Sequence, residues 1–497
     1  MRSVALSPVD IALVVAYLVG VTALGLWASR GIHSSRDYFL AGRSLSWWAA
    51  GMSLVVSDIG AKDMVGLAGD AYRYGLVMMN FDLVGCAIPV LIAAFLFMPF
   101  FWLSGVTTVP EYLGRRYSQG VRTAFALIWS LFMVGTVATI MVSAAAMSAT
   151  LFGLSFWTSV GLTTVLVGLY TVSGGLKAVV VTDVLSCVVL TAGAALVCGL
   201  GLAEVGGWSR LTTLVASHAW TADHLRLLPP ATHEAYPWPA LVLGLGFVLG
   251  PSYWIGNQAI VQRTLGTSSM QAARASYVLC AAIKTVFPLL LVLPGLLAVA
   301  LLSEELGPPG AGWDGNRVLP LLVVRLVPPG ALGVLVGAFA AGVMANLDSY
   351  VNSASTLIVT DLYRPFVNPE ASDTRCLRVG RLLVVILLGA GALMSYQVST
   401  RFGSVFEAFQ TFLSFFQGAL CALLLLGMLT RRATAAGGAA GMAAGVGVAA
   451  WLNLQGVLYL WTAWWSFAAA FLVVLVVSGF TARKSDEELH GLVCWVR

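Results

Sequence analysis

The stretch SLVVSDIGAKDMVGLAG, residues 53–69, decides the class of fold, because it places charged residues inside an otherwise apolar segment. Lys62 stands beside Asp63 and four residues after Asp58, and Gly60 interrupts the apolar run at its middle. A charged side chain in a lipid-spanning segment is costly, and it usually faces a partner, a cavity or a transport path. The pattern is therefore typical of a transport protein rather than of an inert helical bundle.

Composition extends this interpretation to the whole chain. Hydrophobic residues make up 59% of the sequence and charged residues only 10%, which is far from a soluble domain with about 25% charged residues. A second lysine, Lys284, lies inside the apolar stretch YVLCAAIKTVFPLLLVLPG, residues 277–295. We therefore expect an all-α polytopic membrane protein, located in the plasma or inner membrane and surrounded by lipid.

Hydropathy predicts about thirteen membrane spans at roughly twenty residues per span. They lie near residues 9–28, 46–70, 76–104, 121–150, 156–173, 178–203, 238–262, 275–302, 330–360, 379–398, 404–429, 436–455 and 460–480. With the N-terminus outside, most arginines between the spans, including Arg116 and Arg263, fall on cytoplasmic connections, as the positive-inside rule requires.

Several function classes are excluded at this stage. The net charge of +5 follows from the cytoplasmic arginines, so it does not indicate a nucleic-acid partner. No Ser/His/Asp set or phosphate loop stands on one membrane face, and the five histidines fall in loops or the tail, so no enzyme is expected. The seven cysteines are scattered without a CxxC or Cys/His cluster, which argues against a zinc site or a disulfide framework.

Two spans carry matching interruptions about 190 residues apart. The first is SDIGAKD, and the second is VLGPSYWIGNQ, residues 248–258, where Gly250-Pro251 and Gly256 break the run. Paired broken helices at one register are the best sequence indication of an inverted-repeat secondary transporter. The predicted organisation is an added helix and cytoplasmic loop (1–45), a first repeat (46–203), an extracellular loop (204–237), a second repeat (238–429) and C-terminal helices with a short tail (430–497).

Four long motifs carry a family resemblance. They are residues 37–69, residues 174–186 (GGLKAVVVTDVLS), residues 237–265 and residues 339–363 (FAAGVMANLDSYVNSASTLIVTDLY). In this order they resemble the sodium:solute symporter family, in its sodium/sugar cotransporter branch. The resemblance implies a LeuT-type five-plus-five inverted repeat, with an added N-terminal span and further C-terminal ones, that works by alternating access.

The resemblance also implies a solute site. Its expected members are Asp82, where the family has glutamate, the pair Tyr253 and Trp254, then Asn257, Lys284 and Gln410. Carboxylate, amide and ammonium groups suit sugar hydroxyls, which both donate and accept hydrogen bonds, and an aromatic ring can stack on the sugar. The alternative is that Asp82 and Lys284 merely pair to hold two spans together, with the aromatic residues in the core.

Two aspartates depart from the sugar-carrier pattern. Asp58 replaces a usual asparagine, and Asp63 replaces a gate residue that is often histidine or glutamine. A carboxylate here either contacts a sugar hydroxyl, favours an amino or cationic solute, or neutralises Lys62. Asp58 and Lys62 would face each other on a continuous helix, so local neutralisation is slightly favoured.

The cation positions implied by the resemblance are also altered. Carbonyls of Val56, Ile59 and Gly342 take the family's ligand positions, but its serine pair is replaced by Ala345 and Asn346. An asparagine oxygen can ligate sodium, whereas an alanine side chain cannot. A second cation position is expected at Asp183, Asp348 and Ser349.

Three interpretations of the coupling remain open. Sodium binds through Asn346 with Asp183 and Asp348, or a proton on Asp348 or Asp183 replaces it, or Lys62 supplies the charge permanently and makes the carrier uncoupled or proton-coupled. We expect a symporter for a small polar solute, foremost a sugar, with sodium as coupling ion and no other cofactor. The alternatives are an organic acid, an amino acid or a polyol as solute, or a non-transporting solute sensor.

Overall fold

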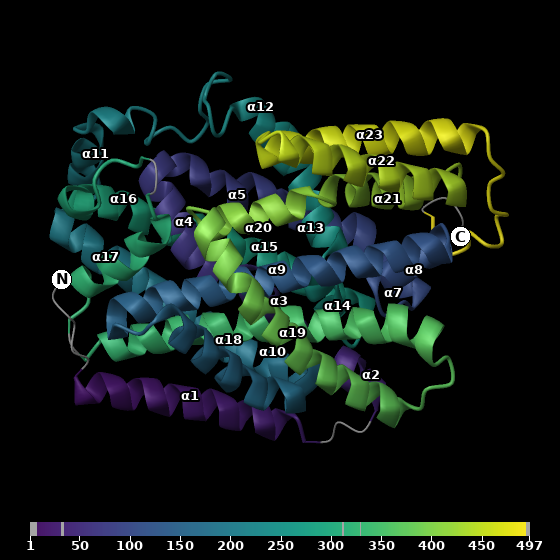
Figure 1. The fold of residues 1–497 in the computed structure, drawn as a ribbon, viewed down its shortest axis with the longest axis horizontal. Helices are drawn as coiled ribbons and strands as arrows, with labels where there is room; N and C mark the ends of the chain where they lie inside the picture. Colours follow the sequence, from purple (N-terminus) through teal and green to yellow (C-terminus); the bar gives the residue numbers. More distant parts are fainter. Residues whose placement is uncertain (1–6, 31–33, 311–312, 329, 494–497) are drawn as a thin grey trace.

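A computed structural model describes residues 7–30, 34–310, 313–328 and 330–493, and this part of the chain is helical (Figure 1). Among these residues the one β-type pairing is an isolated bridge between Leu45 and Thr267. Most long helices, including α1 (Pro8–Ala28) and α23 (Tyr459–Gly479), run along the long axis of the molecule.

The other helices before the long loop are α2 (Ser35–Leu40), α3 (Trp47–Asp58), α4 (Ala61–Tyr74), α5 (Asn80–Asp82), α6 (Ile88–Ile92), α7 (Met98–Ser104), α8 (Val109–Arg116), α9 (Gln119–Phe152), α10 (Phe156–Val205) and α11 (Trp208–Ala216). Those after it are α12 (Trp238–Ala240), α13 (Gly250–Gly256), α14 (Gln258–Leu265), α15 (Met270–Lys284), α16 (Phe287–Leu306), α17 (Val318–Leu326), α18 (Leu332–Leu357), α19 (Asp373–Arg401), α20 (Val405–Ser414), α21 (Gln417–Leu429) and α22 (Ala435–Leu454). Short 3-10 or π-helical stretches join them: η1 (Ala41–Arg43), η2 (Gly75–Met79), η3 (Leu83–Ala87), η4 (Ala93–Phe97), η5 (Ala219–Thr221), η6 (Leu241–Leu249), η7 (Gly315–Arg317) and η8 (Ile358–Val367).

Local sequence explains where many of these helices begin. A serine or threonine hydroxyl accepts a backbone N–H of the first turn, which stabilises the helix start. Such caps are Ser7, Ser34, Thr108, Ser118, Ser155, Ser269, Ser372, Ser404 and Thr434.

Within the described residues, ten helices are long and apolar enough to cross a membrane, or eleven if α20 and α21, bent by 47°, form one span. The expected number is about thirteen. The counts differ because residues 61–104 form one helical run through parts of two expected spans. In addition, Gly175 (φ 54°) interrupts α10, and the part from Gly175 to Val205 is the one counted among the ten. Hydropathy marks apolar length, not helix continuity.

The first predicted interruption lies between α3 and α4. Ile59 (φ −91°, ψ 112°) and Gly60 are extended, which ends α3. The Gly60 amide donates to Asp63 Oδ2 at 2.9 Å, instead of to the Val56 carbonyl, its partner in a continuous helix. The break therefore frees the Val56 carbonyl in the interior, which confirms the prediction for this span.

The second interruption lies at one of its two predicted places. The sequence predicts breaks at Gly250-Pro251 and at Gly256; the first is wrong, because Gly250 and Pro251 begin the helix α13, whereas the second is confirmed, because α13 ends at Gly256. The Ser252 hydroxyl donates to the Val248 carbonyl at 2.6 Å and so satisfies one of the acceptors that precede the proline. The chain breaks at Asn257 (φ −72°, ψ 115°), whose side chain caps α14 through the Ala259 amide at 2.9 Å.

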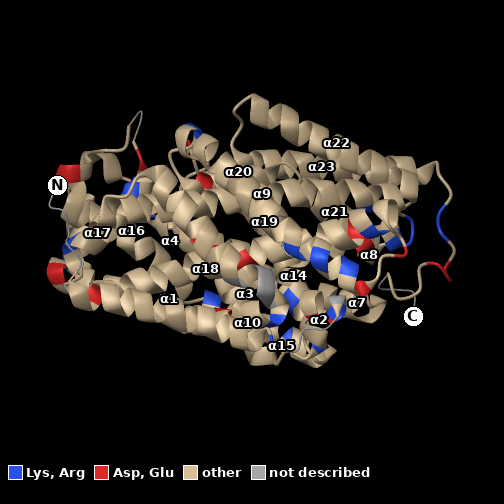
Figure 2. Cartoon of the chain, turned by 60° about the horizontal axis from the view of Figure 1, so that its bottom comes forward, with Lys and Arg blue, Asp and Glu red and all other residues tan. Residues whose placement is uncertain are grey.

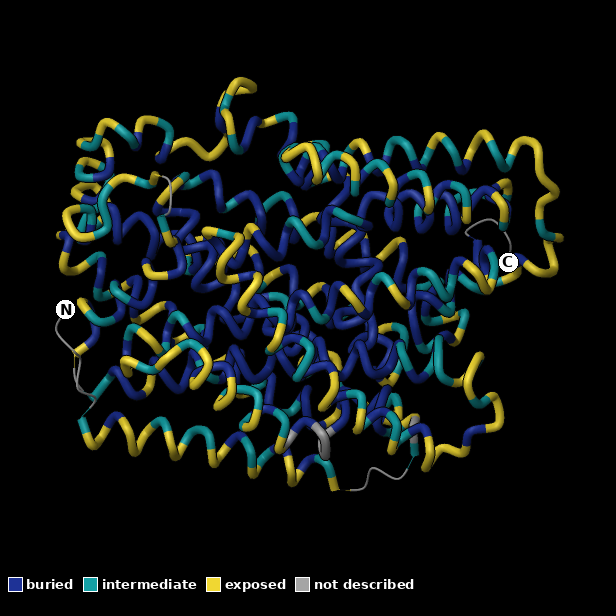
Figure 3. The backbone as a smooth tube through the Cα atoms, viewed as in Figure 1, coloured by how far each residue is buried: buried dark blue, intermediate teal, exposed yellow. Residues whose placement is uncertain are grey.

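Burial and charge follow the expected membrane pattern. Exposed apolar residues lie on outer helices such as α1, whereas the interior is buried (Figure 3). Lys and Arg segments gather at the end of the molecule that carries α2, α7 and α8 (Figure 2). Two arginines assigned to cytoplasmic connections are nevertheless buried. Arg116 donates to the carbonyls of Gly427, Thr430 and Ala433, and Arg263 is 1% exposed.

Candidate functional site

One pocket lies beside the first helix break, and six of the eight predicted solute-site residues line it. These six are Asp58, Asp63, Asp82, Tyr253, Lys284 and Gln410. Aromatic rings that the sequence did not single out complete the wall, namely Phe81, Phe406 and Phe409. They carry no sequence signal, because a phenylalanine in an apolar span resembles any other core residue. A few polar groups converging in a mostly apolar cavity are typical of a solute site.

Lys284 connects two walls of this pocket. It is the last residue of α15, where the helix dipole favours a cation. Its ammonium forms ion pairs with the carboxylates of both Asp58 and Asp82, which come from different helices. In this conformation the predicted solute-binding groups therefore bind one another, so a solute has to join or replace these ion pairs.

Lys62 has different partners from those predicted. Because the helix breaks at Gly60, Lys62 does not pair with the Asp58 carboxylate; its ammonium lies 2.6 Å from Asp63 Oδ2 and 3.1 Å from the Asp58 backbone carbonyl. It also lies 4.0 Å from the centre of the Phe409 ring. The fully buried lysine is thus neutralised locally, by the neighbouring aspartate rather than by Asp58.

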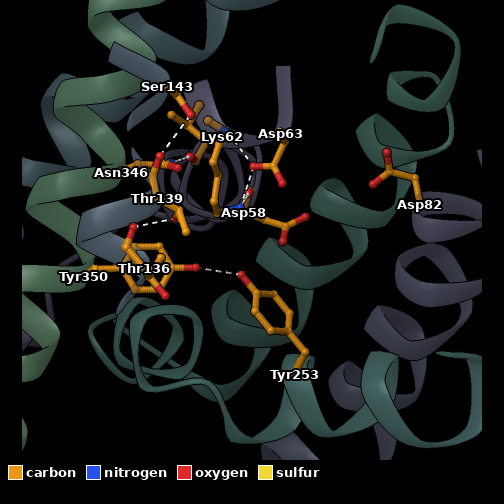
Figure 4. Close-up of polar contacts among 12 residues, drawn as sticks. Asp58, Lys62, Asp63, Asp82, Thr136, Thr139, Ser143, Tyr253, Asn346 and Tyr350 are labelled. Atoms are coloured by element: carbon orange, nitrogen blue, oxygen red, sulfur yellow. Dashed lines mark hydrogen bonds and ion pairs between the residues drawn. The ribbon is translucent and has the colours of Figure 1, made fainter. Parts of the chain in front are cut away.

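The aromatic pair on α13 divides between pocket and core. The Tyr253 hydroxyl lies 3.0 Å from that of Tyr350 on α18, as Figure 4 shows. Trp254 is fully buried outside the pocket lining, and its carbonyl accepts the Tyr277 hydroxyl at 2.9 Å. Asn257 likewise lies outside the lining and caps α14. The structure therefore does not bring Trp254 and Asn257 to the solute pocket.

The first cation position lies where α18 crosses the break. Asn346 is fully buried, and its Nδ2 donates to the freed Val56 carbonyl at 2.5 Å. Its Oδ1 is buried and has no hydrogen-bond partner among the described residues. Gly342, one turn earlier on α18, approaches Gly60 and Ala61 at the break. This set fits a hard cation, since a rotated Asn346 amide would present its oxygen beside the break carbonyls of Val56 and Ile59.

The second cation position contains a guanidinium. Arg263 Nη2 lies 3.3 Å from Asp183 Oδ2 and also donates to the Ser349 hydroxyl. Arg263 Nε donates to Ser53 Oγ at 2.7 Å, and Ser53 donates to Asp183 Oδ2 at 2.5 Å. The Asp348 carboxylate instead contacts α10, where it accepts a hydrogen bond from the Thr171 hydroxyl. The sequence did not identify Arg263 and Ser53 as members of this site. For Arg263 there was one indication, because an arginine inside the mostly apolar stretch at residues 237–265 needs a buried partner.

Comparisons with known proteins identify the family and the fold. A sequence model of the Sodium:solute symporter family matches residues 38–445. Sodium/glucose cotransporter 1 of Sus scrofa is 30% identical, over 98% of this chain and 81% of that protein. The sodium/glucose cotransporter of Vibrio parahaemolyticus is 28% identical, over 98% of this chain and 93% of that protein. A solved structure of a Na+-coupled sialic acid symporter is 21% identical and aligns with a TM-score of 0.84, over 96% of this chain and 99% of that one. The two proteins therefore share a LeuT-like fold.

Proposed function

The chain belongs to the sodium:solute symporter family, and from this premise we propose that it carries a sugar across the membrane together with sodium by alternating access. The single observation that supports the solute class is the pocket in which Asp58, Asp82, Lys284 and Gln410 meet beside Tyr253. Its groups donate and accept hydrogen bonds, as the hydroxyls of a sugar require. The sodium/glucose cotransporters among the relatives support the same class.

For the coupling ion we propose the position at Val56, Ile59, Gly342 and Asn346. Its support is the buried, unpartnered Asn346 oxygen beside a freed carbonyl. At the position of Asp183 and Ser349 the Arg263 guanidinium already supplies a positive charge. We therefore propose one sodium per solute. With a tenfold gradient and 100 mV, one ion supports roughly 500-fold accumulation of a neutral solute.

A solute that carries an amino group is the second candidate. It is favoured by the charges of the pocket, because Lys284 alone faces the two carboxylates of Asp58 and Asp82, while Asp63 is paired with Lys62. The same excess of negative charge disfavours an organic acid.

For the topology we propose that residues 46–203 and 238–429, each of which contains one broken helix, form the inverted repeat. We also propose that the N-terminus lies outside.

Competition for uptake tests the solute class. Labelled glucose uptake into proteoliposomes under an inward sodium gradient would be challenged with galactose, glucosamine or glucuronate. Galactose should compete well and glucuronate poorly. Glucosamine competing far better than galactose would select the second candidate, and strong competition by glucuronate alone would contradict the pocket. Gln410→Ala should weaken glucose uptake, whereas Gln417→Ala, outside the pocket lining, serves as the matched control.

A further inference from the structure

A second, distinct cavity of about 390 Å³ lies at the basic end of the molecule, away from the solute pocket. Arg36, Arg43 and Arg364 line it, together with Gly105, Thr107 and Thr360. These residues come from three parts of the chain that are distant in sequence, namely α2 with the adjoining η1, the connection after α7, and η8. Among the described residues no aspartate or glutamate belongs to its lining.

The charges in this cavity are poorly compensated. Within the described part of the chain, neither Arg36 nor Arg43 forms an ion pair, while Arg364 lies 3.5 Å from Asp373. The nearby carboxylate Glu111 is engaged by Arg115 at 2.6 Å and by the Thr107 amide at 2.8 Å. Burial lowers the pKa of Arg43, and the like charge of Arg36 lowers it further. The like charges of Arg36 and Arg43, which have no ion pair among the described residues, are unfavourable side by side unless an anion joins them.

The backbone holds Arg43 in an unusual conformation. Ala41 (φ 49°), Gly42 (φ 63°) and Arg43 (φ 55°) are consecutive left-handed residues, and two of them are not glycine. Such a conformation costs about 1–2 kcal/mol for an L-residue with a side chain, and it persists where surrounding structure fixes it, often at ligand sites. The Arg43 Nε is buried and has no hydrogen-bond partner among the described residues. The strained turn therefore presents a guanidinium whose Nη2 makes a long contact of 3.5 Å with the Gly105 carbonyl and whose Nε is left for another acceptor.

We propose that this cavity binds a phosphate-bearing anion. Arginine guanidinium groups match phosphate oxygens in charge and in geometry, and a cavity of this size accommodates a phosphate head group. The surroundings favour the head group of an anionic phospholipid. Trp102 lies under Arg43 at 5.2 Å, and Leu103, Phe366 and Val367 are 59–70% exposed next to lining residues. Aromatic and apolar side chains beside basic ones mark the interfacial region of a membrane.

Binding by the purified, full-length protein in neutral detergent tests this site. Phosphatidic acid is one probe and inorganic phosphate the other, and saturable adducts by native mass spectrometry with an accompanying rise in thermal stability are the readouts. The double variant Arg36→Gln/Arg43→Gln should raise the apparent Kd for phosphatidic acid about 30-fold. The control Arg375→Gln/Arg378→Gln removes the same charge from exposed positions of α19 outside the lining, and it should bind like the unaltered protein.

Each outcome decides the matter. If phosphatidic acid binds saturably and only Arg36→Gln/Arg43→Gln loses this binding, the ligand is a lipid head group. If inorganic phosphate alone shows this pattern, the site is supported with free phosphate as its ligand. Binding of neither probe, or equal losses in both double variants, overturns the proposal. If the double variant does not fold, Arg36→Gln alone changes an exposed side chain and should still weaken binding about fivefold.

Discussion

Replacing Asn346 by alanine should strongly weaken the dependence of transport on sodium. The side chain is fully buried, reaches from α18 to the Val56 carbonyl at 2.5 Å, and offers the one side-chain oxygen of the proposed set. A hydrogen bond or ligand contact to a charged partner contributes about 1.5–3 kcal/mol. The sodium concentration for half-maximal uptake should therefore rise roughly 10- to 150-fold.

The assay is solute uptake into proteoliposomes over a range of sodium concentrations at fixed potential. Asn352→Ala is the matched control, since Asn352 is another buried asparagine of α18, outside the proposed ligand set. Asn346→Ser keeps a side-chain oxygen and should fall between the unaltered protein and Asn346→Ala. An unchanged sodium requirement in Asn346→Ala, or an equal shift in Asn352→Ala, would refute the assignment.

Three further predictions concern buried charges and one histidine. Lys284→Met should destabilise the protein by about 3–5 kcal/mol, because it leaves the buried Asp82 and the partly buried Asp58 without their cation. Adding Asp58→Asn should recover part of the loss in thermal unfolding, and no recovery would contradict the pairing. Asp183→Asn should be similarly costly because Arg263 is left buried and unpaired, and a double-mutant cycle with Arg263→Gln should reveal coupling of more than about 1 kcal/mol. Burial lowers the pKa of His224 from its ordinary 6.5, so the unfolded chain binds a proton more readily than the folded one. Stability should fall as the pH drops below about 6.5, and His224→Gln should flatten that part of the melting profile.

The sequence predicted the features that depend on local chemistry. A run of polar residues around Gly60 in an apolar span marks a helix break, and the break lies there. Glycines at four-residue spacing, Gly437, Gly441 and Gly445, are typical of a closely packed helix face. This face of α22 packs against α23, where an added Cβ would meet Val474, Ala470 or Ser466. These features follow from side-chain size and backbone freedom at the positions themselves.

Features that depend on distant partners could not be predicted in this way. Arg263 and Asp183 are 80 residues apart, and nothing near either residue indicates that α14 brings the guanidinium to α10. The register of the second broken helix decides that Tyr253 faces the pocket while Trp254 faces the core. That register depends on the π-helical stretch η6 and on the Ser252 hydroxyl contact, which hydropathy does not report.

Sodium-driven accumulation of a sugar distinguishes a sodium-coupled symporter from an uncoupled carrier. Labelled glucose or galactose uptake into proteoliposomes would be compared under an inward tenfold sodium gradient and under equal potassium, with pH fixed and the membrane potential clamped at zero. One sodium per solute predicts transient accumulation that approaches about tenfold with sodium and no accumulation with potassium. Uptake that is the same in sodium and potassium would contradict the account.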